Sequence, residues 1–272
     1  MRWLLGLLLC VMPYIAHAQA TAGANRTGVD RAGLEQTCPA GRAAPVILRQ
    51  TQAALEANRE IVIVTLGSSS TAGWHSTDLA HSYPAILQSE LAARLPQSHV
   101  AVINRGIGGQ DAADMVQRIE RDVLDVHPTA VIWQVGANGA MRRANPEEFH
   151  RLVAAGVQRL LRAKVDVVLM DNQRAPKILA SPEHDRIDQA LQAVALQTGA
   201  GLFGRGALMD RWQAEGRPYA DFISDDGIHH NDLGYRCLGR AVAQSILDGL
   251  ALNTLTGSVL RAVRSASYLA GR

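Results

Sequence analysis

The sequence predicts an α/β protein, a three-layer α/β/α sandwich around a five-stranded parallel sheet. Short apolar runs alternate with longer stretches whose apolar residues recur at helical spacing. This alternation is typical of parallel strands joined by right-handed helical crossovers. The apolar runs are also continuous, as expected of strands that are covered on both faces.

Length and composition indicate a single globular domain. The chain has 272 residues, of which 47% are hydrophobic and 19% are charged, and its formal net charge is +2. A chain of this length can bury one sizeable core. Because no basic block stands out, nucleic acid is not an expected partner.

The elements follow in a regular order. Strands are expected at residues 61–66, 99–104, 129–135, 165–171 and 200–204. Helices are expected within residues 45–60, 83–95, 111–126, 146–164 and 183–199, and a last one from Asp232 to about Leu247. Binding sites in such sheets form beyond the carboxyl ends of the strands. The loops that follow the strands should therefore lie together; they begin after Leu66, Asn104, Val135, Asp171 and Phe203.

The first residues have the pattern of a secretory signal peptide, with one early Arg, an apolar stretch over residues 3–15 and then Ala16-His17-Ala18. We expect residues 1–18 to be removed after Ala18, which predicts a periplasmic or secreted protein with no stable membrane span. The alternative is an uncleaved anchor, for which the apolar run is short.

The remainder divides into three parts. Residues 19–44 are expected to form a loose lead-in and residues 45–249 the folded domain. In the tail, residues 250–272, apolar residues have loose helical spacing among basic ones. Three interpretations of this tail stay open: a helix on a membrane surface, packing against the domain, and disorder.

Two cysteines remain after signal cleavage, Cys38 and Cys237. An exported protein can keep a disulfide, so one bridge between them is possible. The alternative is two unlinked thiols, with Cys237 buried in a helix. Neither cysteine has the neighbours of a zinc site, and we expect no metal ion or cofactor.

The predicted loops contain the groups that acyl transfer needs. Their sequences are TLGSSSTAG (65–73), NRGIGGQD (104–111), GANGAMRR (136–143) and SDDGIHHNDLGY (224–235). A serine hydroxyl becomes a nucleophile when a base removes its proton, and His229 could be that base. Asp226 could hold the imidazole in the required tautomer. Backbone N–H groups and an Asn amide could bind the developing oxyanion.

These four stretches resemble the signature blocks of the SGNH hydrolase superfamily, also called the GDSL family. The first block, G-D-S-x-T, matches residues 67–71 and implies Ser69 as the nucleophile. The second, N-x-G-x-[SG]-G, matches residues 104–109 and implies the Gly109 N–H as an oxyanion donor. The third, G-x-N-D, matches residues 136–139 and implies the Asn138 side chain as another donor.

The last block, D-x-x-H, matches residues 226–229 and implies Asp226 and His229 as the partners of Ser69. The Ser69 N–H is a third candidate oxyanion donor. Together the blocks span residues 67 to 229, and the resemblance implies the flavodoxin-like SGNH hydrolase fold for residues 45–249. Two positions depart from the pattern, because Ser68 and Gly139 stand where the family has Asp. The absence of these two Asp residues puts in question the shape of the two loops rather than the catalytic chemistry.

Other residues have competing interpretations. Asp225 is an alternative to Asp226 as the partner of His229, and His229 with His230 could form a metal pair. Trp74 could stack on a sugar ring or simply pack in its loop. Arg142 could contact an anionic polymer or begin a helix.

We therefore expect an exported serine esterase that removes O-acetyl or short acyl groups from a carbohydrate or a cell-surface or secreted polysaccharide. Its partner is then an acylated small molecule or polysaccharide. The alternatives are a thioesterase or lysophospholipase, an acyltransferase, and a non-hydrolytic glycan-binding protein of an export or modification system.

Overall fold

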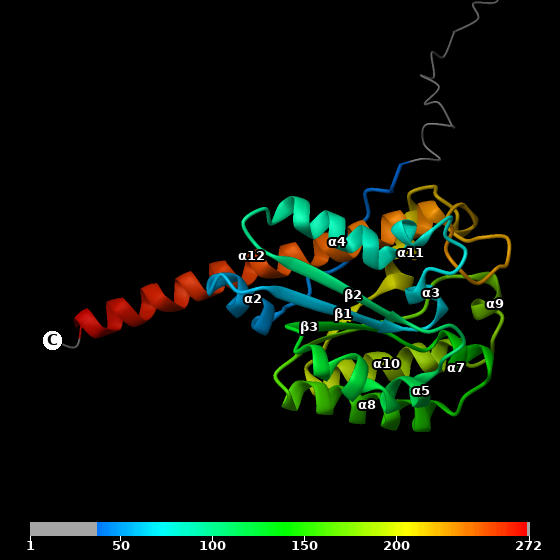
Figure 1. Cartoon of the computed structure of the whole chain (residues 1–272), viewed down its shortest axis with the longest axis horizontal. Helices are drawn as coiled ribbons and strands as arrows, with labels where there is room; N and C mark the ends of the chain where they lie inside the picture. Colours follow the sequence, from blue (N-terminus) through cyan, green and yellow to red (C-terminus); the bar gives the residue numbers. More distant parts are fainter. Residues whose placement is uncertain (1–36, 271–272) are drawn as a thin grey trace, which may run out of the picture. The chain divides into compact units, whose positions relative to one another are not determined.

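The computed structural model describes residues 37–270, with side chains described up to residue 254. The strands of this part form one five-stranded sheet in the order β2-β1-β3-β4-β5, and every pair is parallel. The predicted fold class is confirmed (Figure 1). The strands are β1 (Ile61–Gly67), β2 (Val100–Gly106), β3 (Ala130–Gln134), β4 (Asp166–Met170) and β5 (Gly201–Phe203).

Helices cover both faces of the sheet (Figure 1). Those on one face are α2 (Arg49–Glu56), α4 (Tyr83–Arg94), α11 (Arg205–Ala214) and α12 (Asp232–Ala270). Those on the other face are α5 (Ala112–Gln117), α6 (Ile119–Asp122), α8 (Pro146–Arg162) and α10 (His184–Thr198). The short helices are α3 (Ser69–Ala72), α7 (Ala137–Met141) and α9 (Pro176–Leu179), with 3-10 turns η1 (Leu79–His81), η2 (Leu124–Val126) and η3 (Tyr219–Asp221).

Side-chain alternation along β1 builds two separate cores. Ile61 and Ile63 pack into the core beneath α4 and α12, whereas Val64 and Leu66 pack into the core beneath α5 and α8. Successive residues of a strand point to opposite faces, so a continuous apolar run fills both layers. At the carboxyl edge Gly67 of β1 pairs with Gly106 of β2, and the loops that follow leave from the same side.

The helix predicted over residues 111–126 is broken into α5, α6 and η2. The break lies at Arg118, which is buried and has non-helical backbone angles. Its guanidinium donates to the carbonyl oxygens of Gly67 (3.0 Å) and Arg105 (2.8 Å) at the ends of two strands. Gly67 O also accepts from the Ile107 N–H (3.0 Å), so Arg118 adds a second bond there. A sequence pattern cannot anticipate such long-range bonds.

Two further helices differ from the prediction. Helix α11, over Arg205–Ala214, is not expected from the sequence, and α12 continues to Ala270 rather than ending near Leu247. The Asn231 side chain accepts from the N–H of Gly234 (2.9 Å) and caps the start of α12. Within the described residues, no helix combines the length and apolarity needed to cross a membrane.

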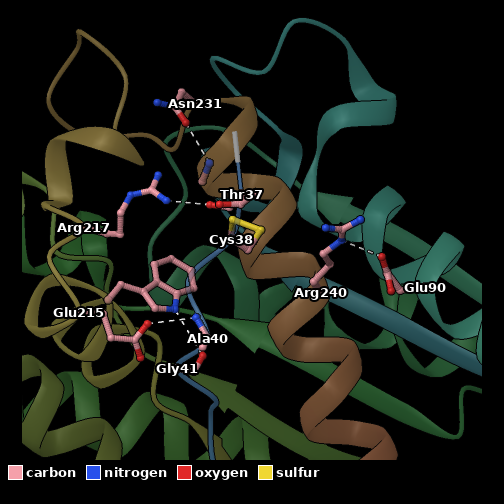
Figure 2. Close-up of a disulfide and its surroundings, with 12 residues drawn as sticks. Thr37, Cys38, Ala40, Gly41, Glu90, Glu215, Arg217, Asn231 and Arg240 are labelled. Carbon is pink, nitrogen blue, oxygen red and sulfur yellow. Dashed lines mark hydrogen bonds and ion pairs between the residues drawn. A yellow bond between two sulfur atoms is a disulfide. The ribbon is translucent and has the colours of Figure 1, made fainter. Parts of the chain in front are cut away.

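Cys38 and Cys237 form a disulfide, with sulfur atoms 2.09 Å apart (Figure 2). It joins the segment before α2 to the buried side of α12. The Ala40 N–H donates to Glu215 (3.0 Å) and the Val46 N–H to Ser245 O (3.1 Å), so residues 38–46 lie against the domain. The predicted signal peptide and residues 19–36 of the lead-in lie outside the described residues.

Candidate active site

The serine loop makes a tight turn at the end of β1. Gly67 ends the strand, Ser68 is extended, and Ser69 is the first residue of α3. Helix α3 packs directly on β2: a Cβ on Gly106 would lie 2.1 Å from the backbone nitrogen of Ala72. Only glycine permits this approach, which fixes α3 against the sheet. The turn is held further by Asn104, whose side chain donates to Thr71 O (2.9 Å).

Ser69, His229 and Asp226 form a hydrogen-bonded chain. The Ser69 hydroxyl lies 2.7 Å from His229 Nε2, and His229 Nδ1 lies 2.5 Å from Asp226 Oδ2. With the proton on Nδ1 donated to the carboxylate, Nε2 is free to accept the hydroxyl proton. The fold thus brings Ser69 to His229, which is 160 positions away in the chain, and to its neighbour Asp226. This is the arrangement that activates a serine.

Asp226 is held in its charged form. Burial alone would raise its pKa, but hydrogen bonds outweigh burial and keep the pKa well below its usual range. The donors to its Oδ1 are the Ser224 hydroxyl (2.6 Å) and the backbone N–H groups of His229 (3.0 Å) and Ile228 (2.9 Å). The carboxylate is therefore ready to stabilise an imidazolium at His229.

Asn138 in α7 contacts the loop after β2 that contains Gly109. The Asn138 side-chain amide donates one hydrogen to Gln110 O (2.8 Å), which leaves its second N–H. Gly109 has a left-handed φ of +78°, which glycine adopts without strain. Among the hydrogen bonds of the described residues, none uses the backbone N–H of Ser69 or Gly109. Arg142 donates to Gly109 O (2.7 Å) and pairs with Asp111 (3.3 Å), so its described contacts brace this loop.

The structure accounts for one of the two departures from the family pattern. Ser68 donates through its N–H (3.1 Å) and its hydroxyl (3.2 Å) to the Gln134 side-chain oxygen at the end of β3. Thr71 donates to the same oxygen (3.1 Å). Gln134 therefore ties both ends of the serine turn to the central strand. Nothing in the structure explains Gly139, where a Cβ would have space.

A buried polar layer lies behind the serine loop. Arg205 is fully buried and donates to Ser70 Oγ (3.0 Å) and Asp171 O (2.9 Å). The Asp171 side chain is also buried and accepts from Gly206 N–H (3.0 Å). Burial raises the pKa of Asp171 to about 6, and the Asp188 carboxylate adds to the rise. The positive charges of Arg205 and Arg174 offset only part of this rise in pKa.

Asp171 should make folding stability fall as the pH rises. Its folded pKa of about 6 exceeds the ordinary value of 3.8, so between these values the native state holds a proton that the unfolded chain has lost. The contribution is present below the lower value and is lost as the pH rises through the folded pKa. The loss amounts to about 3 kcal/mol at most.

Urea unfolding at pH 4 and pH 7 checks this expectation. Asp171→Asn should gain stability relative to the unmodified protein over this interval, because it lacks the titrating group. Asp225→Asn is the control, since the Asp225 side chain is 98% exposed. Parallel pH curves for the unmodified protein and Asp171→Asn would contradict the assignment.

The surroundings of the other candidate site residues show which of them contact His229. Asp225 faces solvent, and Asp226 is the carboxylate bonded to His229. The His230 ring is fully buried and bonds Phe222 O (3.0 Å), so it does not pair with His229. Burial lowers the pKa of His230 to about 3.

Trp74 is 54% exposed, and its ring lies on Gly108 with its centroid 5.8 Å from that of His229.

His75 is a site neighbour that the sequence analysis missed. Its Nε2 lies 3.2 Å from Asp226 Oδ2, and its ring stacks on that of His229 with centroids 5.3 Å apart. Its position six residues after Ser69 carries no motif. The sequence feature that could have identified it is a histidine, besides His229, close after the serine loop.

Comparisons with known proteins identify the family and the fold. The model of a family described as Non-GDSL lipase-like matches residues 37–252. No curated protein sequence matches the chain significantly. A two-domain esterase active on acetylated mannans superposes with a TM-score of 0.65 at 22% identity, over 77% of this chain and 55% of that chain. This chain therefore spans about half the length of that protein.

Two shorter structures are matched over nearly their whole length. A lipase/acylhydrolase from Enterococcus faecalis superposes with a TM-score of 0.59 at 23% identity, over 68% of this chain and 94% of that chain. An acetylxylan esterase from Geobacillus stearothermophilus gives 0.59 at 19% identity, over 68% and 93%. The family match and the shared fold confirm the predicted resemblance to the SGNH hydrolases.

Proposed function

The chain belongs to the Non-GDSL lipase-like family, and we propose that this ester hydrolase forms its acyl-enzyme on Ser69 and releases acetyl or other short acyl groups from a carbohydrate. The observation that carries the proposal is the chain of hydrogen bonds from Ser69 through His229 to Asp226. Such a chain supplies a nucleophile, a base and an orienting carboxylate.

The reaction follows from this geometry. His229 Nε2 takes the proton of Ser69 as its Oγ attacks the ester carbonyl carbon, and Asp226 stabilises the imidazolium. The carbonyl oxygen becomes an oxyanion, which the N–H groups of Ser69, Gly109 and Asn138 bind. Collapse of this intermediate expels the alcohol, which takes the proton from His229. Water then attacks the acyl-enzyme by the same sequence, which releases the carboxylic acid and restores Ser69.

Two observations support an acylated carbohydrate. Trp74 exposes an aromatic face beside His229, and aromatic faces suit the apolar faces of sugar rings. Proteins of the same fold are described as active on acetylated mannans and as an acetylxylan esterase. A polysaccharide substrate also agrees with our proposal that residues 1–18 direct export. A mature chain that begins at Gln19 would support that proposal.

The deciding experiment offers the purified protein acetylated manno- and xylo-oligosaccharides beside long-chain acyl esters and thioesters. We expect acetate release from the oligosaccharides, with Ser69→Ala as the inactive control. Cleavage of the long acyl chains without acetate release would replace this proposal with a lipid hydrolase. Transfer of acetyl to an added acceptor sugar in preference to water would replace it with an acyltransferase.

Asn138→Ala should lower kcat by about 10²- to 10³-fold, since the loss of one oxyanion donor has this effect in related chemistry. KM should change little, because the donor serves the transition state rather than the bound ester. Steady-state kinetics on 4-nitrophenyl acetate measure both constants, and an unchanged thermal midpoint excludes a folding defect. A kcat within about threefold of the unmodified value would remove Asn138 from the oxyanion site.

A further inference from the structure

Three ligating side chains converge at the edge of the site. Among the described residues, His75, Asp226 and His229 form the group of His, Cys, Asp or Glu side chains whose ligand atoms come within reach of one ion. One nitrogen of each imidazole and one carboxylate oxygen all lie within 4.8 Å of one another. Asp226 Oδ1 is occupied by Ser224 and backbone donors, so Oδ2 is the oxygen that faces both rings.

His75 is held in this place against its backbone preference. Its φ is +65°, a left-handed conformation that non-glycine residues adopt at a cost. The flanking loop is fixed on both sides: Tyr235 donates to Trp74 O (2.8 Å), and the Thr77 N–H donates to Asp232 (2.8 Å). The surrounding structure thus maintains a strained histidine beside Asp226, which points to a use for the imidazole.

The donor set is one that zinc uses. Two imidazole nitrogens and a carboxylate, with water in the fourth position, form a common tetrahedral zinc site. Zinc–ligand bonds of about 2.0–2.2 Å place neighbouring ligand atoms roughly 3.3–3.5 Å apart. His75 Nε2 and Asp226 Oδ2 are 3.2 Å apart and fit this spacing, whereas His229 Nδ1 and Asp226 Oδ2 must separate from 2.5 Å. His75 is 38% exposed, which leaves room for a water ligand.

We propose that His75, Asp226 and His229 bind a divalent transition-metal ion, with Zn²⁺ as the best fit, and that the bound ion switches the serine site off. Binding replaces the hydrogen bond between His229 and Asp226. A metal on His229 Nδ1 requires that nitrogen to be without a proton, so the proton of the neutral ring moves to Nε2. Nε2 then faces Ser69 as a donor and cannot accept the hydroxyl proton. The switching-off rests on the proposed function, but metal binding does not.

A second histidine–carboxylate cluster shows why this site is distinct. His184 lies 3.0 Å from Asp185 and 3.4 Å from Asp188, but Arg174 Nη1 lies 3.0 Å from its Nε2. A guanidinium at that nitrogen occupies the place of an ion and repels it. The His75 group has no such cation among the contacts of its described atoms.

Zinc titration of tag-free Ser69→Ala protein by calorimetry tests binding without relying on activity. We expect one ion per chain. Adding His75→Asn should weaken binding by at least about tenfold, since even changes to the hydrogen-bond partners of metal ligands alter affinity by about 10- to 100-fold. Asn tolerates the left-handed backbone of His75. The control is His81→Asn, an exposed histidine whose ring lies 2.9 Å from the Asp78 carboxylate.

Equal zinc affinity in the His75→Asn and His81→Asn proteins, or no binding in either, would overturn the proposal. The inhibition is measured separately on wild-type protein with 4-nitrophenyl acetate, with EDTA to reverse it. Saturating zinc should lower kcat by about 10³-fold or more, as expected for a triad histidine in the wrong tautomer. His75→Asn should resist this inhibition. Absence of esterase activity in EDTA would refute the proposed function alone, and the titration would still decide the metal site.

Discussion

Replacing Ser69 with alanine should reduce ester hydrolysis by about 10⁴- to 10⁶-fold and leave the fold intact. The hydroxyl lies 2.7 Å from His229 Nε2 and is the group through which His229 and Asp226 act. Without the Ser69 hydroxyl, His229 and Asp226 have no nucleophile to activate. The loss of activity should therefore approach the loss caused by removing all three residues. Initial rates with 4-nitrophenyl acetate give the effect on catalysis, and circular dichroism gives the effect on folding.

A fluorophosphonate probe distinguishes Ser69 from its neighbours. We expect the label on Ser69 by mass spectrometry and none on the Ser69→Ala protein. Ser70→Ala is the matched control and should still be labelled, because the Ser70 hydroxyl faces the buried Arg205 rather than His229. Label on another serine in the wild-type protein would reject Ser69 as the nucleophile.

Loss of the disulfide should lower the free energy of unfolding by as much as about 5 kcal/mol. Cys38 and Cys237 are separated by 199 positions, and closing a loop of this length removes much entropy from the unfolded chain. Guanidinium unfolding of Cys38→Ser beside the unmodified protein measures the loss. For a domain of this size it corresponds to a thermal midpoint lower by about 10 °C or more.

Reduction supplies the control for this variant. In the presence of a phosphine reductant both proteins lack the bridge and should unfold at nearly the same denaturant concentration. A difference of under about 1 kcal/mol without reductant would show that residues 38–46 separate from the domain at little cost. The bridge would then tether a segment rather than stabilise the fold.

The sheet was predictable because its signal is local. The five apolar runs coincide with β1 to β5 to within about two residues, since strands buried on both faces must be apolar throughout. Helix α11 was not predictable, because its first residue, Arg205, is buried by partners distant in sequence. The break at Arg118 has the same cause. Tertiary contacts decide both, and no local pattern encodes them.

The candidate site was predictable in part for the same reason. Ser69 directly follows β1, so the topology places it at the carboxyl edge of the sheet. Asp226 and His229 lie between η3 and α12, and their D-x-x-H spacing rather than a strand end identified them. His75 and Gln134 lie outside the recognised blocks, and their contacts depend on how one loop and one strand end are oriented. The choice between a disulfide and free thiols was likewise open, because Cys38 reaches α12 only in the folded chain.

The contact between Ser68 and Gln134 couples the residue types that these two positions can hold. The Gln134 oxygen accepts from the N–H and the hydroxyl of Ser68 and from Thr71, in a buried place. Aspartate is the usual residue of the family at position 68. Its carboxylate has no proton to donate and would place a second acceptor next to the Gln134 oxygen. Asp at position 68 therefore needs a hydrogen-bond donor from position 134 in place of this acceptor, which a rotated Gln134 amide or a different residue there can supply. The residue at position 134 thus sets which side chains the serine turn can carry at position 68.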